Sequence, residues 1–138
     1  MNEPLPLPQM LDEWFRWAAW VNDPNRDESK SSELIGWNEF DWTVQDYPEV
    51  AWQAILEAMN QPRMEPHLGT LAAGPLEDLL SLHGELFIDR VEIEARANPK
   101  FAWLLGGMYQ YKMSESIWAR VQAVWDRRGW NGTSANDA

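Results

Sequence analysis

Cysteine is absent from this sequence, and histidine is nearly so. Without cysteine the chain has no disulfide, thiolate nucleophile, cysteine-ligated zinc or iron–sulfur cluster, which suits a reducing compartment such as the cytoplasm. The two histidines, His67 and His83, are by themselves too few for a metal site, which needs at least three converging ligands. The sequence contains no HExxH pair and no carboxylate-rich calcium loop. We therefore predict that the chain binds no metal and no cofactor.

Basic residues are also scarce. Eleven Lys and Arg stand against 22 Asp and Glu, which gives a formal net charge of −11. Proteins that bind nucleic acid or an anionic membrane usually present a basic face, so we expect neither partner. No apolar run approaches the ~18 residues of a membrane-spanning helix, and the first ten residues lack the basic and apolar regions of a signal peptide. We predict a cytoplasmic protein that is attracted to basic proteins, among which nucleic-acid-acting ones are the commonest.

Tryptophan, by contrast, is plentiful, with ten residues in a chain of 138. The length suits a single domain with one core. Each tryptophan can bury a large area, so even a short chain can build a substantial core from them. Tryptophan also anchors protein interfaces, and ten exceed what such a core needs. We predict one domain with some exposed tryptophan, present as a monomer or a weak homodimer.

The first third of the chain is predicted to contain one helix and one long loop. Three prolines make residues 1–8 an extended lead-in. Residues 9–22 have the apolar spacing of a helix, which ends where Asp23 precedes a proline. Residues 23–47 are polar at first and then alternate aromatic with acidic side chains. Because no partner strand is nearby, we predict an irregular acidic loop there with at most one helical turn.

Residues 48–130 are predicted to form a helical core. Pro48 occupies the first position of a helix, and Pro62 closes it. The Gly74-Pro75 pair begins the next helix, and Gly84 ends it. These short elements predict an all-α fold, a compact bundle of about six or seven short helices arranged as stacked helical hairpins.

The C-terminal part continues this pattern. The Gly106-Gly107 pair indicates a bend or a close helix crossing. Ser114 or Ser116 caps a last helix that ends at the basic residues 127–128, and residues 131–138 are predicted to be a disordered tail.

Several segments resemble a family. The most specific are LAAGPLEDLL (71–80), HG (83–84) and FIDR (87–90), with AWQAILEAM (51–59), NPKFAWLLGGMY (98–109) and IWARVQA (117–123) in support. On these residues the chain from Pro48 onwards resembles an uncharacterised family of small bacterial helical domains. The resemblance implies a helical fold and a bacterial origin, and it supplies no catalytic residue. Small acidic bacterial proteins of this sort often prove to be immunity proteins that neutralise toxins, which is an association by type.

The segment 27–49 is the main candidate for a functional surface. It carries seven acids against one base, Lys30, and its aromatic residues are interleaved with the acids. Acids steer and pair with a basic partner, and aromatics supply the buried contacts of an interface. Alternatively, the aromatics fold the segment back onto the helices, and both alternatives stay open for Trp37 and Phe40. The predicted partner-binding residues are Glu33, Trp37, Glu39, Asp41, Trp42, Asp46 and Glu49.

An enzyme site would have to lie around Glu77, Asp78 and His83. Two adjacent acids on a helix point about 100° apart, so they are poorly placed to act as an acid/base pair. They are better explained as acids at a helix N-terminus, and His83 as a capping or half-buried histidine. We therefore predict that the chain is no enzyme and has no catalytic residues.

Taken together, these features predict an acidic protein-binding domain. The favoured function is a bacterial immunity-type inhibitor that covers the active site of a basic, nuclease-type toxin. The alternative is an adaptor or regulatory interaction module with no inhibitory role.

Overall fold

The computed structural model describes residues 3–130, and within that range it contains seven α-helices and no strand. The all-α prediction is confirmed. The chain divides into two compact units, Met1–Thr70 and Leu71–Ala138. The predicted single domain stays a prediction, and the predicted tail 131–138 lies outside the described residues.

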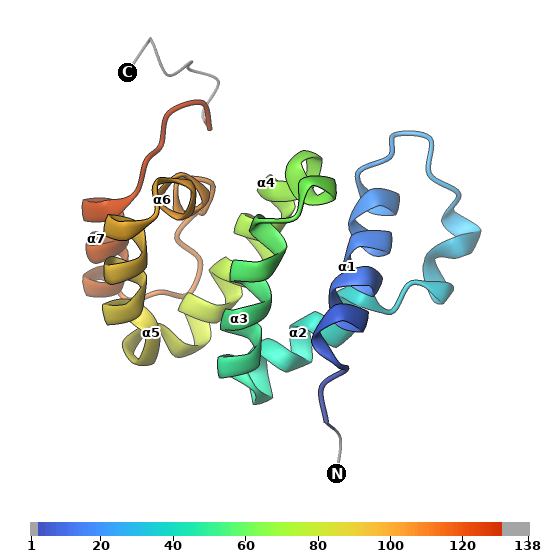
Figure 1. The fold of residues 1–138 in the computed structure, drawn as a ribbon, viewed down its shortest axis with the longest axis horizontal. Coiled ribbons are helices and arrows are strands. Elements are labelled where there is room, and N and C mark those ends of the chain that lie inside the picture. Colours follow the sequence, from blue (N-terminus) through green and yellow to red (C-terminus); the bar gives the residue numbers. More distant parts are fainter. Residues whose placement is uncertain (1–2, 131–138) are drawn as a thin grey trace. The chain divides into compact units, whose positions relative to one another are not determined.

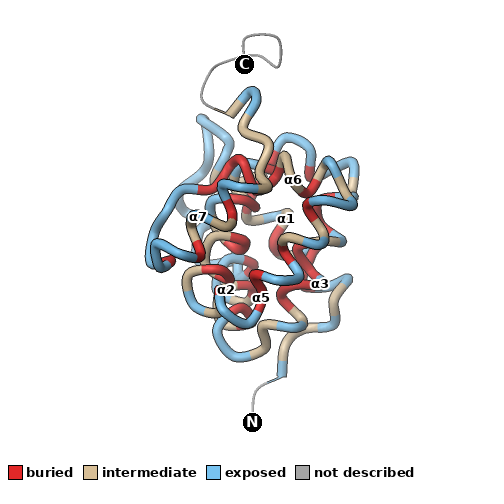
Figure 2. Tube along the Cα trace, turned by 90° about the vertical axis from the view of Figure 1, so that its left-hand side faces the viewer, coloured by how far each residue is buried: buried red, intermediate tan, exposed pale blue. Residues whose placement is uncertain are grey.

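Three α-helices make up most of the first unit (Figure 1): α1 (Leu7–Val21), α2 (Gly36–Asp46) and α3 (Pro48–Met59). A 3₁₀ helix, η1 (Glu28–Glu33), joins α1 to α2. Another, η2 (Pro62–His67), follows α3 and leads into the short α4 (Leu68–Leu71). Helix α1 packs against α2, and α2 packs against α3. Figure 2 shows buried positions recurring along each helix, as expected when one face of a helix enters a core.

Helix α1 begins at Leu7, so the predicted lead-in was two residues too long. The reason is that Pro8 lies in the first turn, where a missing backbone N–H leaves no hydrogen bond unmade. The predicted apolar face is confirmed at Met10, Trp14 and Ala18, which are all buried.

The predicted irregular loop over residues 23–47 was wrong in its second half, because residues 36–46 form α2. The buried residues of this helix are Gly36, Phe40, Thr43 and Val44, spaced i, i+4, i+7 and i+8. That is the period of a helix with one buried face. The alternation of aromatics with acids hid this period, since only Phe40 among residues 37–42 is buried.

Helix α3 begins at Pro48, as predicted. The next predicted start, at Gly74-Pro75, was wrong. Helical backbone is already present from Leu68, and the π-helix η3 (Ala72–Leu76) carries Pro75 in its interior. A π turn is wider than an α turn, and it accommodates the residue that would otherwise break the helix.

In the second unit α5 is assigned over Glu77–Ala97, and the helix break predicted at Gly84 is confirmed to within one residue, because two helical stretches meet there in a kink. It is kinked at His83, whose φ of −131° and ψ of 28° are not helical. Gly84 is buried, and a Cβ on it would lie 3.1 Å from Cγ2 of Ile117. The glycine therefore lies beside the kink and permits close packing against α7 (Glu115–Val124).

Residues 125–130 fold back on α6 (Pro99–Leu105). Ser114 caps α7 as predicted, accepting the Ile117 N–H at 3.2 Å, but α7 ends at Val124 and not at the basic residues. Residues 125–130 are held by hydrogen bonds from Asp126 N–H to the Ala102 carbonyl (2.8 Å) and from Trp130 Nε1 to the Trp103 carbonyl (2.6 Å).

The close approach predicted at Gly106-Gly107 is confirmed, although the neighbour is this extended segment and not a helix. A Cβ at Gly106 would collide with the Asp126 carbonyl, and one at Gly107 would lie 2.9 Å from the Trp130 ring. Among the described helices, none combines the length and the apolar character needed to cross a membrane.

Candidate protein-interaction surface

The candidate surface is built on α2, whose position is fixed by its contact with α1. Gly36, at the first residue of α2, lies so close to α1 that a Cβ there would overlap the Glu13 carbonyl group. Phe40 is buried one turn later, edge-on to Trp14, with 6.0 Å between the ring centroids. These contacts turn the Gly36–Phe40 side of α2 inward, and the opposite side is left for solvent or a partner.

Of the two aromatics left open by the sequence, Trp37 is exposed and Phe40 is buried. Trp37 has 48% of its surface exposed, and Ile35 just before α2 has 42%. Sequence reasoning missed Ile35. The local sequence holds no signal for it, because the exposure of Ile35 depends on where α2 begins. We call Glu33, Ile35, Trp37, Glu39, Asp41, Trp42, Asp46 and Glu49 the α2 surface.

The structure distributes the predicted residues over two rows of the exposed side of α2. Trp37 and Asp41 are one turn apart, and Asp41 accepts a hydrogen bond from the Gln45 amide at 2.9 Å. The second row holds Glu39, Trp42 and Asp46 at i, i+3 and i+7, and these spacings place them on one side of a helix.

The second row is tied together by hydrogen bonding and ring contacts. The Trp42 indole N–H donates to the Glu39 carboxylate at 3.1 Å, and the Trp42 ring meets Tyr47 edge-on at 5.6 Å. Trp42 is half-buried. It therefore supports the helix more than it presents a contact, so Trp37 is the better anchor for a partner.

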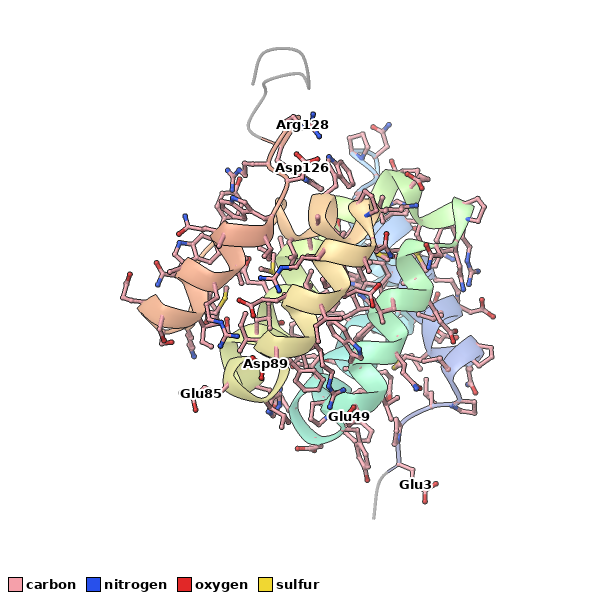
Figure 3. All side chains as sticks on the ribbon, turned by 60° about the vertical axis from the view of Figure 1, so that its left-hand side comes forward. Glu3, Glu49, Glu85, Asp89, Asp126 and Arg128 are labelled. Atoms are coloured by element: carbon pink, nitrogen blue, oxygen red, sulfur yellow. The ribbon has the colours of Figure 1, made fainter. Side chains whose placement is uncertain are left out.

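Glu33 and Glu49 border the α2 surface at its two ends. Glu33 is exposed at the end of η1, and Glu49 is exposed in the first turn of α3 (Figure 3). An acid in the first turn of a helix is stabilised by the positive end of the helix dipole. The start of α3 thus explains Glu49 without any partner, but the same argument does not apply to Glu33, which lies at the end of η1.

The bases of the first unit do not lie within the α2 surface. Residues 1–66 contain 13 acids and four bases. Three bases form ion pairs elsewhere, Arg16 with Glu13, Arg26 with Glu28, and Arg63 with Asp12. The fourth, Lys30, lies near Asp27, whose pKa is held below its ordinary value mainly by hydrogen bonds from Ser29. The α2 surface is therefore a concentration of negative charge around an exposed tryptophan.

The alternative site around His83 is not assembled as an acid/base pair with Glu77 and Asp78. His83 lines an open groove of about 400 Å³ at the kink of α5, together with Ser81, Glu85, Lys112 and Ser114. Glu77 is outside that lining. It accepts the Tyr109 backbone N–H at 3.1 Å, and burial raises the pKa of its carboxyl. Within residues 3–130 no three His, Asp or Glu side chains are grouped so that they could hold a metal ion.

The other histidine, His67, is buried. Its ring meets Phe15 edge-on at 5.6 Å, and its Nδ1 is 2.9 Å from the Asn22 amide nitrogen. Burial lowers the pKa of His67, which favours the neutral ring that can accept this hydrogen bond. His67 therefore connects the end of α1 to η2, and its role is structural.

The described residues thus define an all-helical protein with an acidic, tryptophan-bearing surface. Over residues 25–129 the sequence matches a family of unknown function, DUF6869, and the chain belongs to that family. The match begins at residue 25, so it includes the α2 surface, which the resemblance drawn from Pro48 onwards did not reach. No curated protein and no solved structure matches the chain.

Proposed function

We propose that this protein is a protein-interaction module that uses the α2 surface to bind a basic partner. The observation that supports the proposal most directly is Trp37, which is about half exposed on α2, with Asp41 one turn further along its own row and Glu39 and Asp46 in the second row. Covering an exposed aromatic ring with a partner removes apolar surface from water and so stabilises the complex. Tryptophan is enriched among the interface residues that contribute most to binding energy. The surrounding acids select for partners of positive charge.

Within this proposal the favoured partner is a nuclease-type toxin, and the favoured role is that of a cytoplasmic, bacterial immunity protein. An enzyme that acts on nucleic acid needs a basic cleft for phosphates. The row of acids on α2 would occupy such a cleft in place of phosphates, and Trp37 would pack against its rim. Occlusion of this kind needs no catalytic group and no cofactor in the inhibitor.

The test starts from capture of the partner. The full chain is immobilised, a lysate of the source cells is passed over it, and the retained proteins are identified after washes at low and high salt. The captured protein is then purified and assayed for nucleic-acid cleavage with and without the chain. The inhibitor proposal requires a basic protein whose cleavage activity the chain suppresses. If a partner is retained without any loss of its activity, the chain is an adaptor instead.

Variants then test the surface. Trp37→Ala and the double reversal Asp41→Lys with Asp46→Lys should each weaken binding by at least about tenfold, the size of a modest interface hot spot. The matched control reverses Glu3 and Glu85, which changes the net charge equally at exposed sites outside the α2 surface. Equal loss in the control would mean that only net charge matters. Unchanged affinity in both α2 variants would refute the surface.

A further inference from the structure

A second feature lies in the other unit, where the charge of the chain changes sign. Residues 101–130 carry two acids and four bases, whereas residues 1–100 carry 19 acids and seven bases. Seven of the 17 aromatic residues also fall within residues 101–130. This part of the chain is therefore basic and aromatic, and it is opposite in charge to the α2 surface.

Within this part, Arg127 lies against two aromatic rings. Its guanidinium carbon is 4.9 Å from the centroid of the Trp125 ring and 5.4 Å from that of Tyr109, and both distances are within the range of a cation–π interaction. The Trp125 ring is itself placed edge-on to Trp118 of α7, at 5.1 Å. Nη1 of Arg127 also donates to the Met108 carbonyl at 3.4 Å. The guanidinium is thus oriented before any partner arrives.

Arg127 has no acidic partner among residues 3–130, since its hydrogen bond and both ring contacts are made with other groups. The adjacent acid, Asp126, is paired instead with Arg128 at 2.9 Å (Figure 3). A guanidinium that stacks on a ring still directs N–H groups outward in its own plane, and the Met108 carbonyl accepts from only one of its nitrogens. Because Arg127 is only half-buried, it remains within reach of a carboxylate from outside.

The loop that carries Tyr109 adds a second base and a second exposed ring. Lys112 is exposed, its ammonium lies 5.2 Å from the centroid of the Tyr111 ring, and it forms no ion pair within the described part of the chain. Tyr109 and Tyr111 are exposed by 60% and 61%. Positive charge and exposed aromatic surface therefore occur together in this loop, as they do at many interface contacts of arginine and tyrosine.

We propose that Tyr109, Trp125 and Arg127 bind a carboxylate side chain from an acidic segment of a second partner protein. We call these three residues the Arg127 site. The planar guanidinium matches a carboxylate through two parallel hydrogen bonds, and the exposed Tyr109 ring covers the apolar stem of the same side chain. The α2 surface belongs to the other unit and selects for the opposite charge, so either surface can fail without the other.

A nucleic acid is a poorer occupant than an acidic protein segment. Proteins hold a nucleic-acid backbone by neutralising several phosphates with several bases, and the bases without an acidic partner in this loop and at its neighbour are Lys112 and Arg127. The net charge of −11 also repels a polyanion from a distance. A single carboxylate held by one oriented guanidinium avoids both difficulties.

Titration with a hexaglutamate peptide tests the proposal, with the full chain observed by NMR. The Arg127 Nε–H and Trp125 indole N–H signals should shift and saturate, with a dissociation constant on the order of 1 mM for so small a ligand. A hexaglutamine peptide should shift neither signal. The absence of a saturable Arg127 shift up to about ten times that concentration would overturn the proposal.

Charge variants separate the site from the general effect of charge. Arg127→Gln should weaken hexaglutamate binding at least about tenfold, because it removes the charged fork. Arg127→Lys keeps the charge without the fork and should still weaken binding about threefold. The matched control, Arg96→Gln, removes the same charge at an exposed position of α5 and should leave the affinity within about twofold of wild type. Equal weakening by Arg127→Gln and Arg96→Gln would refute the site.

The ring contact is tested at Tyr109. Tyr109→Leu removes the ring and should weaken hexaglutamate binding about threefold, the size of an exposed cation–π interaction. Tyr109→Phe keeps the ring and should bind as wild type. Equal affinities of the two variants would show that this ring does not orient Arg127.

A hexathymidylate oligonucleotide tests the other class of occupant. Added at the same concentrations, it should shift the Arg127 signal less than hexaglutamate does. If the oligonucleotide binds more tightly than the peptide and the binding is lost in Arg127→Gln, the site recognises phosphate and the proposal of an acidic protein segment is overturned.

Discussion

At the scale of the single residue, Gly36 determines how closely α1 and α2 pack. A methyl group at this position would overlap the Glu13 carbonyl carbon and oxygen, which are backbone atoms and cannot rotate away. The two helices would have to separate along a contact that includes Trp14 and Phe40. Overpacking of this kind usually costs one to a few kcal/mol, and the rigid neighbour places this case near the upper end.

We therefore expect Gly36→Ala to lower the free energy of unfolding by about 3 kcal/mol in urea titrations. Gly74→Ala is the matched control, because nothing lies within 4 Å of a Cβ at Gly74 and its φ is not positive. That control should be neutral or stabilising by roughly 0.5 kcal/mol, since alanine favours helical backbone more than glycine does. Equal effects of the two substitutions would show that α1 and α2 are not in close contact at Gly36.

Glu77 gives a pH dependence whose sign follows from its burial. Burial raises the pKa of its carboxyl, against the opposing effect of the hydrogen bond from the Tyr109 N–H. The folded state therefore favours the protonated form. The stability contributed by this group is fully present below the unfolded pKa of about 4.3, and it is lost as the pH rises through the higher folded pKa.

Glu77→Gln should remove this dependence and still offer a carbonyl oxygen to the Tyr109 N–H. Relative to wild type, the variant should gain stability between pH 4 and pH 7, as measured by urea unfolding at both values. Glu85→Gln, at an exposed position of the same helix, controls for the general loss of a negative charge. A Glu77→Gln effect that does not change with pH would mean that the carboxyl is not desolvated by folding.

At the scale of the element, the sequence predicted well those helices that have local start signals. Pro48 and Ser114 mark starts that depend only on backbone chemistry within one turn, and both are correct. The errors occur where tertiary packing decides. The predicted helix start at Gly74-Pro75 was wrong because Pro75 is carried inside a π turn. The breaks at Gly84 and at Gly106-Gly107 were located, but not the distant side chains and backbone for which these glycines make room. Nothing in the local sequence indicates which distant residues pack against these glycines.

The candidate surface was likewise predictable only where the local sequence decides, and not where tertiary packing does. The acids of segment 27–49 were evident from composition, but which aromatic is exposed was not. Trp37 and Phe40 are three residues apart on one helix, and only the direction of α1 decides which of them is covered. Ile35 was missed for the same reason, because its exposure depends on where α2 begins.

The segment 125–130 is the element most dependent on one side chain. Trp130 donates to the Trp103 carbonyl, and the centroids of the two rings lie 4.3 Å apart. The Trp130 ring also lies against the Gly106-Gly107 pair. In return, the Trp103 indole donates to the Arg128 carbonyl at 3.1 Å. At the turn, Asp126 and Arg128 form an ion pair (Figure 3), but its exposure limits its contribution to stability.

We expect Trp130→Ala to destabilise the protein by roughly 2 kcal/mol, about half the cost for a fully buried tryptophan, since Trp130 is only half-buried. Amide hydrogen exchange should show lost protection at Asp126 first, because its N–H bond to Ala102 depends on this packing. Trp37→Ala, at an exposed tryptophan, should change stability by less than about 0.5 kcal/mol. Retained protection at Asp126 would show that the segment is held by other contacts.

At the scale of the whole molecule, the charge is distributed unevenly, with most of the excess acids in residues 1–66. Such an asymmetry attracts a basic partner from a distance, and salt screens the attraction. The Debye length falls from about 30 Å at 0.01 M to about 8 Å at 0.15 M ionic strength. Contacts made by Trp37, by contrast, act only after the two proteins have met, so they govern dissociation.

For the partner captured by the α2 surface, we therefore expect the association rate to fall at least about tenfold over that range of salt, with little change in the dissociation rate. Asp41→Lys should flatten the salt dependence of association more than Glu3→Lys does, although both change the net charge equally. Trp37→Ala should speed dissociation and leave the salt dependence intact. Stopped-flow mixing measures both rates. If Trp37→Ala changes only association, or if the two charge reversals are indistinguishable, then the acids and the tryptophan do not form one binding surface.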